Sequence, residues 1–504
     1  MSCPVVRRTR WVALCILLVL SGCAVLGPNY EAPKLSETDV PGRWTSPTET
    51  TDETTSHSTP TDPVPTSTPR WWTELSDTVL DQLVEAAFGS SPTLEAALAK
   101  LRQSQSNTSQ AKASGAPSVD GSAASERAAS DSTESPGNES WLSMNSSWEL
   151  DLFGAVRRGK EGALAREEAQ LATLADVRVS LAADVTDAYL SHRACQSQIA
   201  LSEQDLTSRI ATEKLTANSV EVGFTAPFEG NRSRASVAEA RTRLTATSAK
   251  CRRLENLLTR LTGIARPTLM KSLADKPTGL NRLPVPKNFN IAIPSQALVQ
   301  RPDIRAAERK LAAASADIGL AEADRYPRLK LNGELGYTTS ETSGSGSLSF
   351  GTWSFGPSLS LPIFDGGRRA AAVEAAKSRY EEALADFRSK TRSAIQEVED
   401  ALTRYAAAHE RTENARLAAN QYQQFFDAVD GRYHEGASNL LELEDARRVM
   451  LSAQQTLLGV QQERLQAWVA LNRSTGGGAQ YGADTIANSV KSAGKPAAKS
   501  SAPN

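Results

Sequence analysis

Three carboxylates crowd the point where a helical pattern restarts after a glycine, in the stretch YHEGASNLLELEDARR from Tyr433 to Arg448. They are Glu442, Glu444 and Asp445, and Leu441 lies four residues before Asp445 on the same helix face. Like charges held close together repel one another and attract cations. The stretch therefore favours ion attraction over catalysis. A second explanation stays open for the Glu pair, because acids in a first helical turn also interact favourably with the helix dipole.

Groups that perform catalysis or bind metal are sparse in the chain. The four histidines are scattered, and neither a Cys-x-x-Cys nor a His-Glu-x-x-His motif occurs. The stretch GSGSLSFG has no following helical pattern that would hold a phosphate. A net charge of -2 gives no electrostatic reason to expect nucleic acid as a partner. We expect no enzyme, no catalytic residue, no metal site and no cofactor.

The N-terminus has the pattern of an export signal. Three arginines precede the apolar run WVALCILLVL, which is too short to span a bilayer but is typical of a signal peptide. The next residues, LSGC, end at Cys23 and resemble a bacterial lipobox. This resemblance implies that residues 1–22 are removed, that Cys23 carries an N-acyl diacylglycerol lipid, and that Ala24 directs sorting to the outer membrane. The alternative is an ordinary signal peptide with a cysteine near its cleavage site.

Two segments lack the apolar residues that a core needs. Residues 23–70 are rich in Thr, Ser and Pro, and we interpret them as a lipidated N-terminus and an extended tether. Residues 477–504 are rich in Ala, Ser, Lys and Gly, and we predict a disordered tail.

The sequence between these segments is duplicated. Landmarks recur in the same order at offsets between 210 and 213 residues: Pro92 and Pro302, Pro117 and Pro327, Phe153 and Phe364, Gly223 and Gly436, Gly263 and Gly476. Such a nearly constant offset indicates two structural copies. We assign them to residues 71–263 and 302–476, with an inter-repeat segment at 264–301.

Each copy reads as a helix, two strands and a long helical hairpin. Apolar and polar residues alternate in LSMNSSWELDL and in WSFGPSLSLPI, so we predict strands at about 140–153 and 350–363. Weaker partner strands are predicted at about 117–129, in the nearly featureless SVDGSAASERAAS, and at about 328–339.

One face of these strands is apolar and the other is polar. Glu149 and Asp151 on the polar face suit a wet lumen, and Trp141 and Trp148 suit an aromatic girdle at a membrane interface. A soluble sandwich sheet would show the same alternation. Four strands are too few to close a barrel, so a barrel would require several copies of the chain.

The predicted hairpins cover about 156–262 and 367–474, and their first arms contain no proline and little glycine. Each of these arms would run roughly 90–100 Å at 1.5 Å per residue. Cys195 and Cys251 each lie 28 residues from the turn at Gly223, so antiparallel arms bring them level. A disulfide is then feasible, and two small buried residues are the alternative.

Several motifs together resemble the TolC-type outer-membrane efflux proteins, in particular the NodT-type lipoprotein branch that serves resistance-nodulation-division (RND) pumps. The most specific stretch is IPSQALVQRPDIRAAERKLAAASADIGLAEADRYPRLKL, residues 293–331. WWTEL at Trp71, LPIFDGG at Leu361 and the acidic stretch at Tyr433 also match. The resemblance covers about residues 23–478.

This resemblance implies a mainly α fold with a transmembrane β part. A homotrimer would form a twelve-stranded β-barrel in the outer membrane, continued by a periplasmic α-helical tunnel. The chain would be a passive exit duct for drugs or other small toxic compounds, lipid-anchored in the cell outer membrane. Its partners would be a periplasmic membrane-fusion adaptor protein and an inner-membrane RND pump.

The resemblance also assigns roles to residues at the two hairpin tips. Leu441 and Asp445 match the positions of the periplasmic gate, which Glu442 and Glu444 would widen into an acidic mouth. Arg232 corresponds to Asp445 in the repeat, and with Arg234 it is a hypothetical partner of the acidic cluster on an adjacent hairpin. The tips that would contact the adaptor are Gly223, Phe224 and Thr225 in the first copy and Gly436, Ala437 and Ser438 in the second.

Two other functions remain open on the sequence alone. One is a conduit of the same fold that serves an ABC-type exporter, for type I protein secretion or for macrolides. The other, from a different class, is a periplasmic coiled-coil lipoprotein that forms no channel.

Overall fold

The computed structural model describes residues 25–33, 44–45, 70–129, 137–274, 280, 282–286, 298, 300–342 and 346–478. Cys23, the leader, most of the tether and the tail after Gly478 lie outside these residues. The chain divides into two compact units. The strand unit comprises Met1–Lys34, Leu98–Ala172 and Arg305–Ser389, and the hairpin unit comprises Leu35–Ala97, Thr173–Ile304 and Lys390–Asn504.

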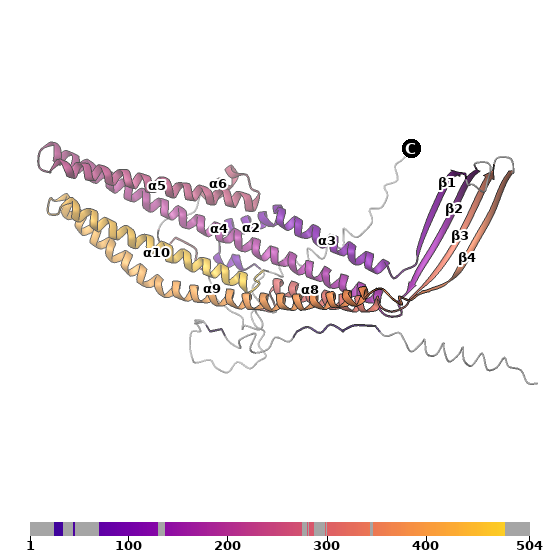
Figure 1. The fold of residues 1–504 in the computed structure, drawn as a ribbon. Coiled ribbons are helices and arrows are strands. Elements are labelled where there is room, and N and C mark those ends of the chain that lie inside the picture. The colour runs from indigo at the N-terminus through magenta and orange to yellow at the C-terminus, as the bar shows by residue number, and fades with distance from the viewer. Residues whose placement is uncertain are drawn as a thin grey trace, which may run out of the picture. The chain divides into compact units, whose positions relative to one another are not determined.

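The order of elements repeats within the chain (Figure 1). The first copy contains η1 (Trp71–Leu75), α2 (Thr78–Ser90), α3 (Pro92–Ala113), β1 (Ser118–Ala128), β2 (Gly137–Leu150), α4 (Ala155–Glu221) and α5 (Pro227–Thr262), followed by α6 (Arg266–Ala274). The second copy contains α8 (Pro302–Ala323), β3 (Arg328–Thr342), β4 (Gly346–Ser360), α9 (Arg368–His434) and α10 (Leu440–Ser474). A helix, two strands and a hairpin therefore occur twice, as the sequence predicted.

The four strands form one antiparallel sheet in the order β1-β2-β3-β4. β2 of the first copy pairs with β3 of the second, so the sheet joins the two copies. Among the described residues, β1 and β4 each keep one edge without a partner strand. An unpaired edge exposes a row of backbone N–H and C=O groups that can pair with another chain.

The strands differ from the predicted ones at their ends. β2 begins at Gly137 and ends at Leu150, not at 140 and 153, and β3 and β4 extend towards each other to Thr342 and Gly346. Asp151 therefore does not lie on the wet face of a strand. Its carboxylate accepts hydrogen bonds from the backbone N–H groups of Val156 (3.1 Å) and Arg157 (2.9 Å), and so satisfies free donors at the start of α4.

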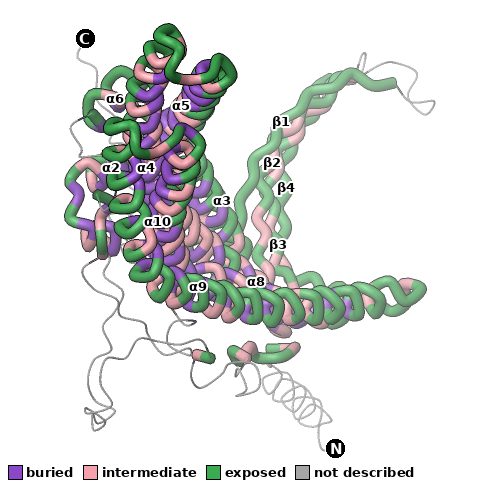
Figure 2. The backbone as a smooth tube through the Cα atoms, turned by 90° about the vertical axis from the view of Figure 1, so that its left-hand side faces the viewer, coloured by how far each residue is buried: buried purple, intermediate pink, exposed green. Residues whose placement is uncertain are grey.

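The sheet has one apolar face that is open to solvent in the single chain. Met144, Leu335 and Trp353 lie in one row across three strands and are 53%, 61% and 79% exposed. The strands are exposed along most of their length (Figure 2). Trp141 and Trp148 cannot both belong to one girdle, because they are seven residues apart in a regular strand and point to opposite faces. Only Trp148 lies on the apolar face.

α4 and α9 have 67 residues each, which gives a length of roughly 100 Å at 1.5 Å per residue. Within the hairpin unit, α9 buries a seam of mostly small side chains at alternating spacings of three and four residues. The seam consists of Ala394, Val398, Ala401, Tyr405, Ala408, Thr412, Ala415 and Ala419. This is the spacing of a coiled coil. No helix in the described part of the chain is both long and apolar enough to cross a membrane.

Two features fasten the first hairpin and the base of the hairpin unit. Cys195 on α4 and Cys251 on α5 form a disulfide with a Cα–Cα distance of 5.6 Å, which is a normal separation for a bridge. Trp71, Trp72 and Trp468 are at most 2% exposed. The ring of Trp71 packs edge-on against both others, with centroids 5.8 and 5.2 Å apart. The WWTEL motif therefore supplies part of the core.

The described N-terminal residues lie along the strand unit. Leu26 donates its backbone N–H to the carbonyl of Phe153 (3.2 Å), close to the junction of β2 and α4. Arg158, only 3% exposed, donates to the carbonyls of Leu26 (3.0 Å) and Gly27 (3.1 Å) and to Asn29 Oδ1 (3.0 Å). The chain just after Cys23 is thus held at the end of the sheet where the helices begin.

Candidate functional site

Both hairpins turn in the same way at their tips. Gly223 and Gly436 adopt positive φ angles of 79° and 74°, which glycine reaches without steric cost. The following residues, Phe224 and Ala437, donate their N–H groups back to Ser219 and Arg432 across five residues. This hydrogen-bond pattern is the Schellman motif that ends helices. The repeated glycines noted in the sequence therefore have the same structural reason.

The first tip presents apolar side chains to solvent. Val222, Phe224 and Phe228 are 66%, 88% and 66% exposed. Thr225 is half-buried, and its backbone N–H donates to the carbonyl of Ser219 (3.1 Å). An apolar surface of this kind on a helix turn is typical of a site that packs against another protein.

The second tip is polar and closely capped. Asn439 accepts a hydrogen bond on its side chain from the N–H of Glu442 (2.9 Å), as an N-cap residue does. Glu442 in turn accepts from Ser438 Oγ (2.7 Å) and pairs with Arg432 (3.4 Å). These contacts partly neutralise the charge of Glu442 at the turn. They are compatible both with a role at the gate and with an acid that only stabilises the first helical turn.

Leu441 and Asp445 share one exposed face of α10. Leu441 is 55% exposed, and the side chain of Asp445 is 56% exposed. Asp445 pairs with Arg448, whose side chain is itself 75% exposed. Exposed ion pairs of this kind contribute little to stability. The two predicted gate residues are thus directed away from the hairpin's own core and remain accessible.

Glu444 does not widen an acidic mouth, and that expectation is wrong. Its side chain is 13% exposed and faces α4 and α5. It accepts hydrogen bonds from Arg209 Nη1 (2.7 Å) and Ser236 Oγ (3.1 Å), and also pairs with Arg447 on its own helix. The reason is helical geometry, because Leu440, Glu444 and Arg447 share the face that packs against the first hairpin.

The pair of Glu444 with Arg447 belongs to a buried ionic network. The Arg447 side chain is fully buried, donates to Thr212 Oγ1 (2.9 Å) and lies 5.4 Å from the ring centroid of Phe426. Burial lowers the pKa of the Arg447 guanidinium below its usual range. Arg209 also pairs with Asp205 (2.8 Å). The network therefore joins both hairpins of one chain.

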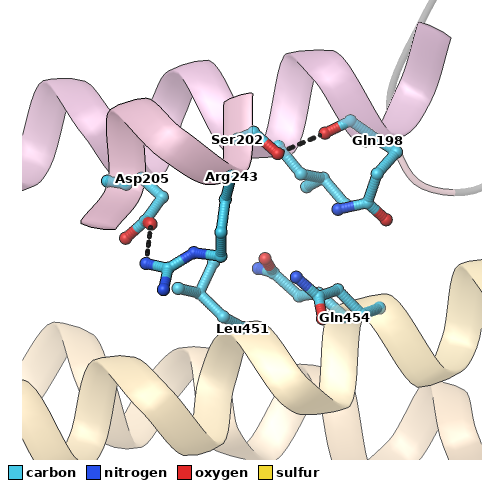
Figure 3. Close-up of a pocket in the computed structure, with 9 residues that line it drawn as sticks. Gln198, Ser202, Asp205, Arg243, Leu451 and Gln454 are labelled. Carbon is cyan, nitrogen blue, oxygen red and sulfur yellow. Dashed lines mark hydrogen bonds and ion pairs between the residues drawn. The ribbon is translucent and has the colours of Figure 1, made fainter. Parts of the chain in front are cut away.

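Asp205 adds a second contact of the network with α5, where Arg243 pairs with it at 3.4 Å (Figure 3). These residues border a recess of about 10 Å³ that is also lined by Leu451 and Gln454 of α10. Such a volume holds about one water molecule. The recess is therefore part of the interface between the hairpins, and it is too small to be a solute site.

The two arginines predicted to lock the gate are both on the exposed surface of α5. Arg234 donates to Asn231 Oδ1 (2.7 Å), three residues earlier. Within the described part of one chain, neither arginine forms an ion pair with Glu442, Glu444 or Asp445. Their pairing with an adjacent hairpin stays a prediction. The described residues also contain no group of His, Cys, Asp or Glu suited to a metal ion.

Sequence reasoning missed Arg209 and Arg447. Arg447 stands three residues after Glu444, and Arg448 stands three residues after Asp445, which is contact spacing on a helix. That spacing signals that both acids have cationic partners. No comparable signal exists for Arg209, because it is 235 residues from Glu444 in the sequence.

The chain is similar to known proteins over most of its length. It is 31% identical to nodulation protein T of Rhizobium leguminosarum bv. viciae, over 93% of each chain. It is 27% identical to the solvent efflux pump outer membrane protein SrpC of Pseudomonas putida, over 92% of this chain and 97% of that protein. The solved structure of the outer-membrane channel OprN has 30% sequence identity and a TM-score of 0.77, over 91% of this chain and 100% of that one.

The model of the outer membrane efflux protein family matches residues 83–264 and 293–477, that is, both structural copies. The fold of the chain is that of these channels, mostly helical with one small antiparallel sheet. The chain belongs to the outer membrane efflux protein family.

Proposed function

We propose that this outer-membrane efflux channel works as a homotrimer in which each chain supplies four strands of a twelve-stranded barrel. The observation that carries the proposal is the sheet itself, which has two edges without a partner strand among the described residues and an exposed apolar face. Edge pairing between three copies removes every free edge, as closure does in membrane barrels. The apolar face then contacts lipid and the polar face contacts water.

The gate of the channel is formed by Leu441 and Asp445. Both are exposed on one face of α10, so three copies place three leucines and three aspartates around the axis. The leucines narrow the passage and the carboxylates attract cations. This arrangement predicts a cation-selective channel at its helical end.

The buried network around Glu444 and Arg447 sets the position of this ring within each chain. It fastens α10 to α4 and α5 one helical turn or less from Leu441 and Asp445. A shift of the second hairpin against the first would break these contacts. We propose that the network holds the gate closed, and that Arg232 and Arg234 add contacts between neighbouring copies.

The remaining proposals concern partners and the anchor. The relatives named as solvent and antibiotic efflux pump components support service in a tripartite RND-type system, with an adaptor contacting the tips. The exposed Phe224 supports this use of the first tip.

Lipidation of Cys23, after removal of residues 1–22, is supported by the hydrogen bond of Leu26 beside the β2–α4 junction, where the sheet ends. Mass spectrometry of the N-terminal peptide tests the lipid.

The channel and its gate are tested together in planar lipid bilayers. The purified protein forms cation-selective pores, and Asp445→Asn reduces the preference for K⁺ over Cl⁻. Glu413→Gln, an exposed acid on α9 far from the tip, is the matched control and leaves selectivity unchanged. Absence of pores contradicts the channel, and an unchanged selectivity in Asp445→Asn contradicts the gate. Deletion of the gene, with measured drug and solvent susceptibility, then identifies the exported compounds.

A further inference from the structure

Towards the ends of the strands that lie away from the helices, the apolar face of the sheet becomes polar and the polar face becomes apolar. On the apolar face, the row Leu142–Tyr337 is followed by a row of hydroxyls. This next row consists of Ser125, Ser140, Thr339 and Ser349. Two hydrogen bonds within it, Ser125–Ser140 (2.8 Å) and Thr339–Ser349 (3.1 Å), place these side chains on the same face.

The opposite face changes in the other direction. Near the helices it is polar, with Asn332 bonded to Ser147 (3.2 Å) and Ser358 (2.8 Å). Further along, Trp141 and Phe350 stand on either side of Thr338 in one row. Phe350 is 46% exposed, and Leu348, in the following row, is 65% exposed. Large apolar side chains thus stand on the same face of the sheet as the polar rows nearer the helices.

Two carboxylates border these apolar residues. Glu126 pairs directly with Glu139 across β1 and β2, in the same row as Ser340 and Leu348. Like charges directly opposite one another destabilise a sheet. No ion pair to either carboxylate is found within the described part of the chain. The repulsion between Glu126 and Glu139 does not stabilise the sheet, and large aromatic side chains stand beside it on an otherwise polar face. We interpret this combination as a functional feature.

The length of the apolar belt locates these rows. From Leu150 to Leu142 the strand rises about 26 Å at 3.3 Å per residue, which is less across a membrane because the strands tilt. An apolar band of about 25 Å is typical of outer-membrane barrels. A tilt of about 40° reduces this rise to roughly 20 Å across the membrane, so the rows of Trp141 and Glu139 lie at the outer edge of the apolar band, near the outer exit of the pore.

The width of the pore brings any solute close to them. Twelve strands about 4.8 Å apart and tilted by about 40° give a backbone diameter of roughly 24 Å. Three tryptophans and three phenylalanines that project inwards reduce the opening to roughly half of that. A solute of drug size cannot leave through such an opening without touching an aromatic ring or a carboxylate.

We propose that Trp141, Leu348, Phe350, Glu126 and Glu139 of the three chains form an exit collar that binds lipophilic organic cations. The aromatic faces attract a cation that has lost part of its water, and the carboxylates add attraction at longer range. The collar rests on the proposed trimeric channel and narrows its solute class to cations with apolar substituents. It is a second contact point, distinct from the acidic gate on the hairpin tips.

The test measures how tetraphenylphosphonium blocks the current of single channels when it is added to the compartment that the β-barrel end of the channel faces. Tetraphenylphosphonium blocks the wild-type current, whereas tetraethylammonium, which carries the same charge without aromatic rings, blocks at least about 10-fold less. The double variant W141S/F350S raises the half-blocking concentration by about 10-fold or more. Trp141→Phe keeps an aromatic ring and stays within about two-fold of wild type.

The carboxylates are tested separately by E126Q/E139Q, which removes charge from an exposed row and keeps the side-chain shape. Its half-blocking concentration rises several-fold at low salt and less at high salt, because the lost attraction is screened. Asp445→Asn leaves block from the strand side unchanged.

The outcomes separate the two proposals. If no preparation forms pores, the channel itself is wrong. If pores form but tetraphenylphosphonium blocks the wild type and E126Q/E139Q equally at low salt, or blocks W141S/F350S as well as the wild type, the collar is wrong and the channel stands. If W141S/F350S fails to assemble, the E126Q/E139Q result decides.

Discussion

The two hairpins of this chain are copies with the same turn and different surfaces. Positions 213 residues apart correspond, so Asn231 and Arg234 of the first hairpin occupy the places of Glu444 and Arg447 in the second. In both, the arginine bonds to the residue three positions earlier. The first pair is exposed, whereas the second is built into the network between the hairpins. Duplication has kept the backbone and the local contact, while the surroundings have changed what the contact does.

The hairpins are also fastened by different means. The first has the Cys195–Cys251 disulfide, and the corresponding positions of the second are Ala408 and Arg464. The second has the Asn439 cap, and the corresponding residue of the first is Ala226, which forms no side-chain cap. The comparison implies that the first hairpin is tied along its arms and the second at its tip and through the buried network.

The largest effect is expected for the buried arginine. Arg447→Ala leaves Glu444 without one of its partners in a buried site, and removal of one member of a buried pair costs about 3–5 kcal/mol. Arg234→Ala, the matched change in the first hairpin, is exposed and stays within about 0.5 kcal/mol. Urea unfolding of both variants in detergent measures the difference. Equal losses in the two would show that the hairpins are not different in this respect.

The disulfide is expected to have the next largest effect. The bridged cysteines are 56 residues apart, and closing a loop of this size stabilises the folded chain by about 2–4 kcal/mol. C195S/C251S lowers the free energy of unfolding by this amount, and the unfolding temperature falls with it. A reductant lowers it in the wild type and has no effect on the variant, and a wild type insensitive to reductant would remove the bridge from the account.

A smaller effect is expected at the caps. Asn439→Ala removes the side-chain acceptor for the N–H of Glu442 and costs about 1 kcal/mol. Ala226→Asn introduces a cap at the matching position of the first hairpin and gives no loss. Hydrogen exchange of the first turn of α10 measures the change locally. Unaltered exchange there would mean that the network alone holds this helix end.

The smallest expected effect is a dependence on pH confined to the first hairpin. Burial lowers the pKa of His192 below its usual 6.5, against the opposing attraction of Glu255, and the matching residue of the second hairpin is Tyr405. The unfolded chain then binds more protons than the folded one below about pH 6.5, so stability falls as the pH drops through that range. His192→Gln flattens this part of the stability curve. An identical acid slope in both proteins would refute the assignment.

The sequence predicted what depends on repeats and periodicity. The duplication, the hairpins, the alternating strands and the shared helix face of Leu441 and Asp445 all follow from local spacing. The partners of Glu444 do not, because Arg209 reaches it only through packing of the two hairpins. Trp141 could have been placed by the same alternation, because it stands one residue before the apolar Leu142 and so faces the other way. The end of the strand at Asp151 could not, because it depends on the hydrogen bonds of that side chain to the next helix.

The most direct test of the trimeric channel is the mass of the intact lipidated protein in detergent, measured by native mass spectrometry. We predict three chains per particle, which separate into single chains on heating. A stable particle that contains one chain, with the apolar face of Met144, Leu335 and Trp353 protected from exchange with solvent by its own helices, would contradict the account.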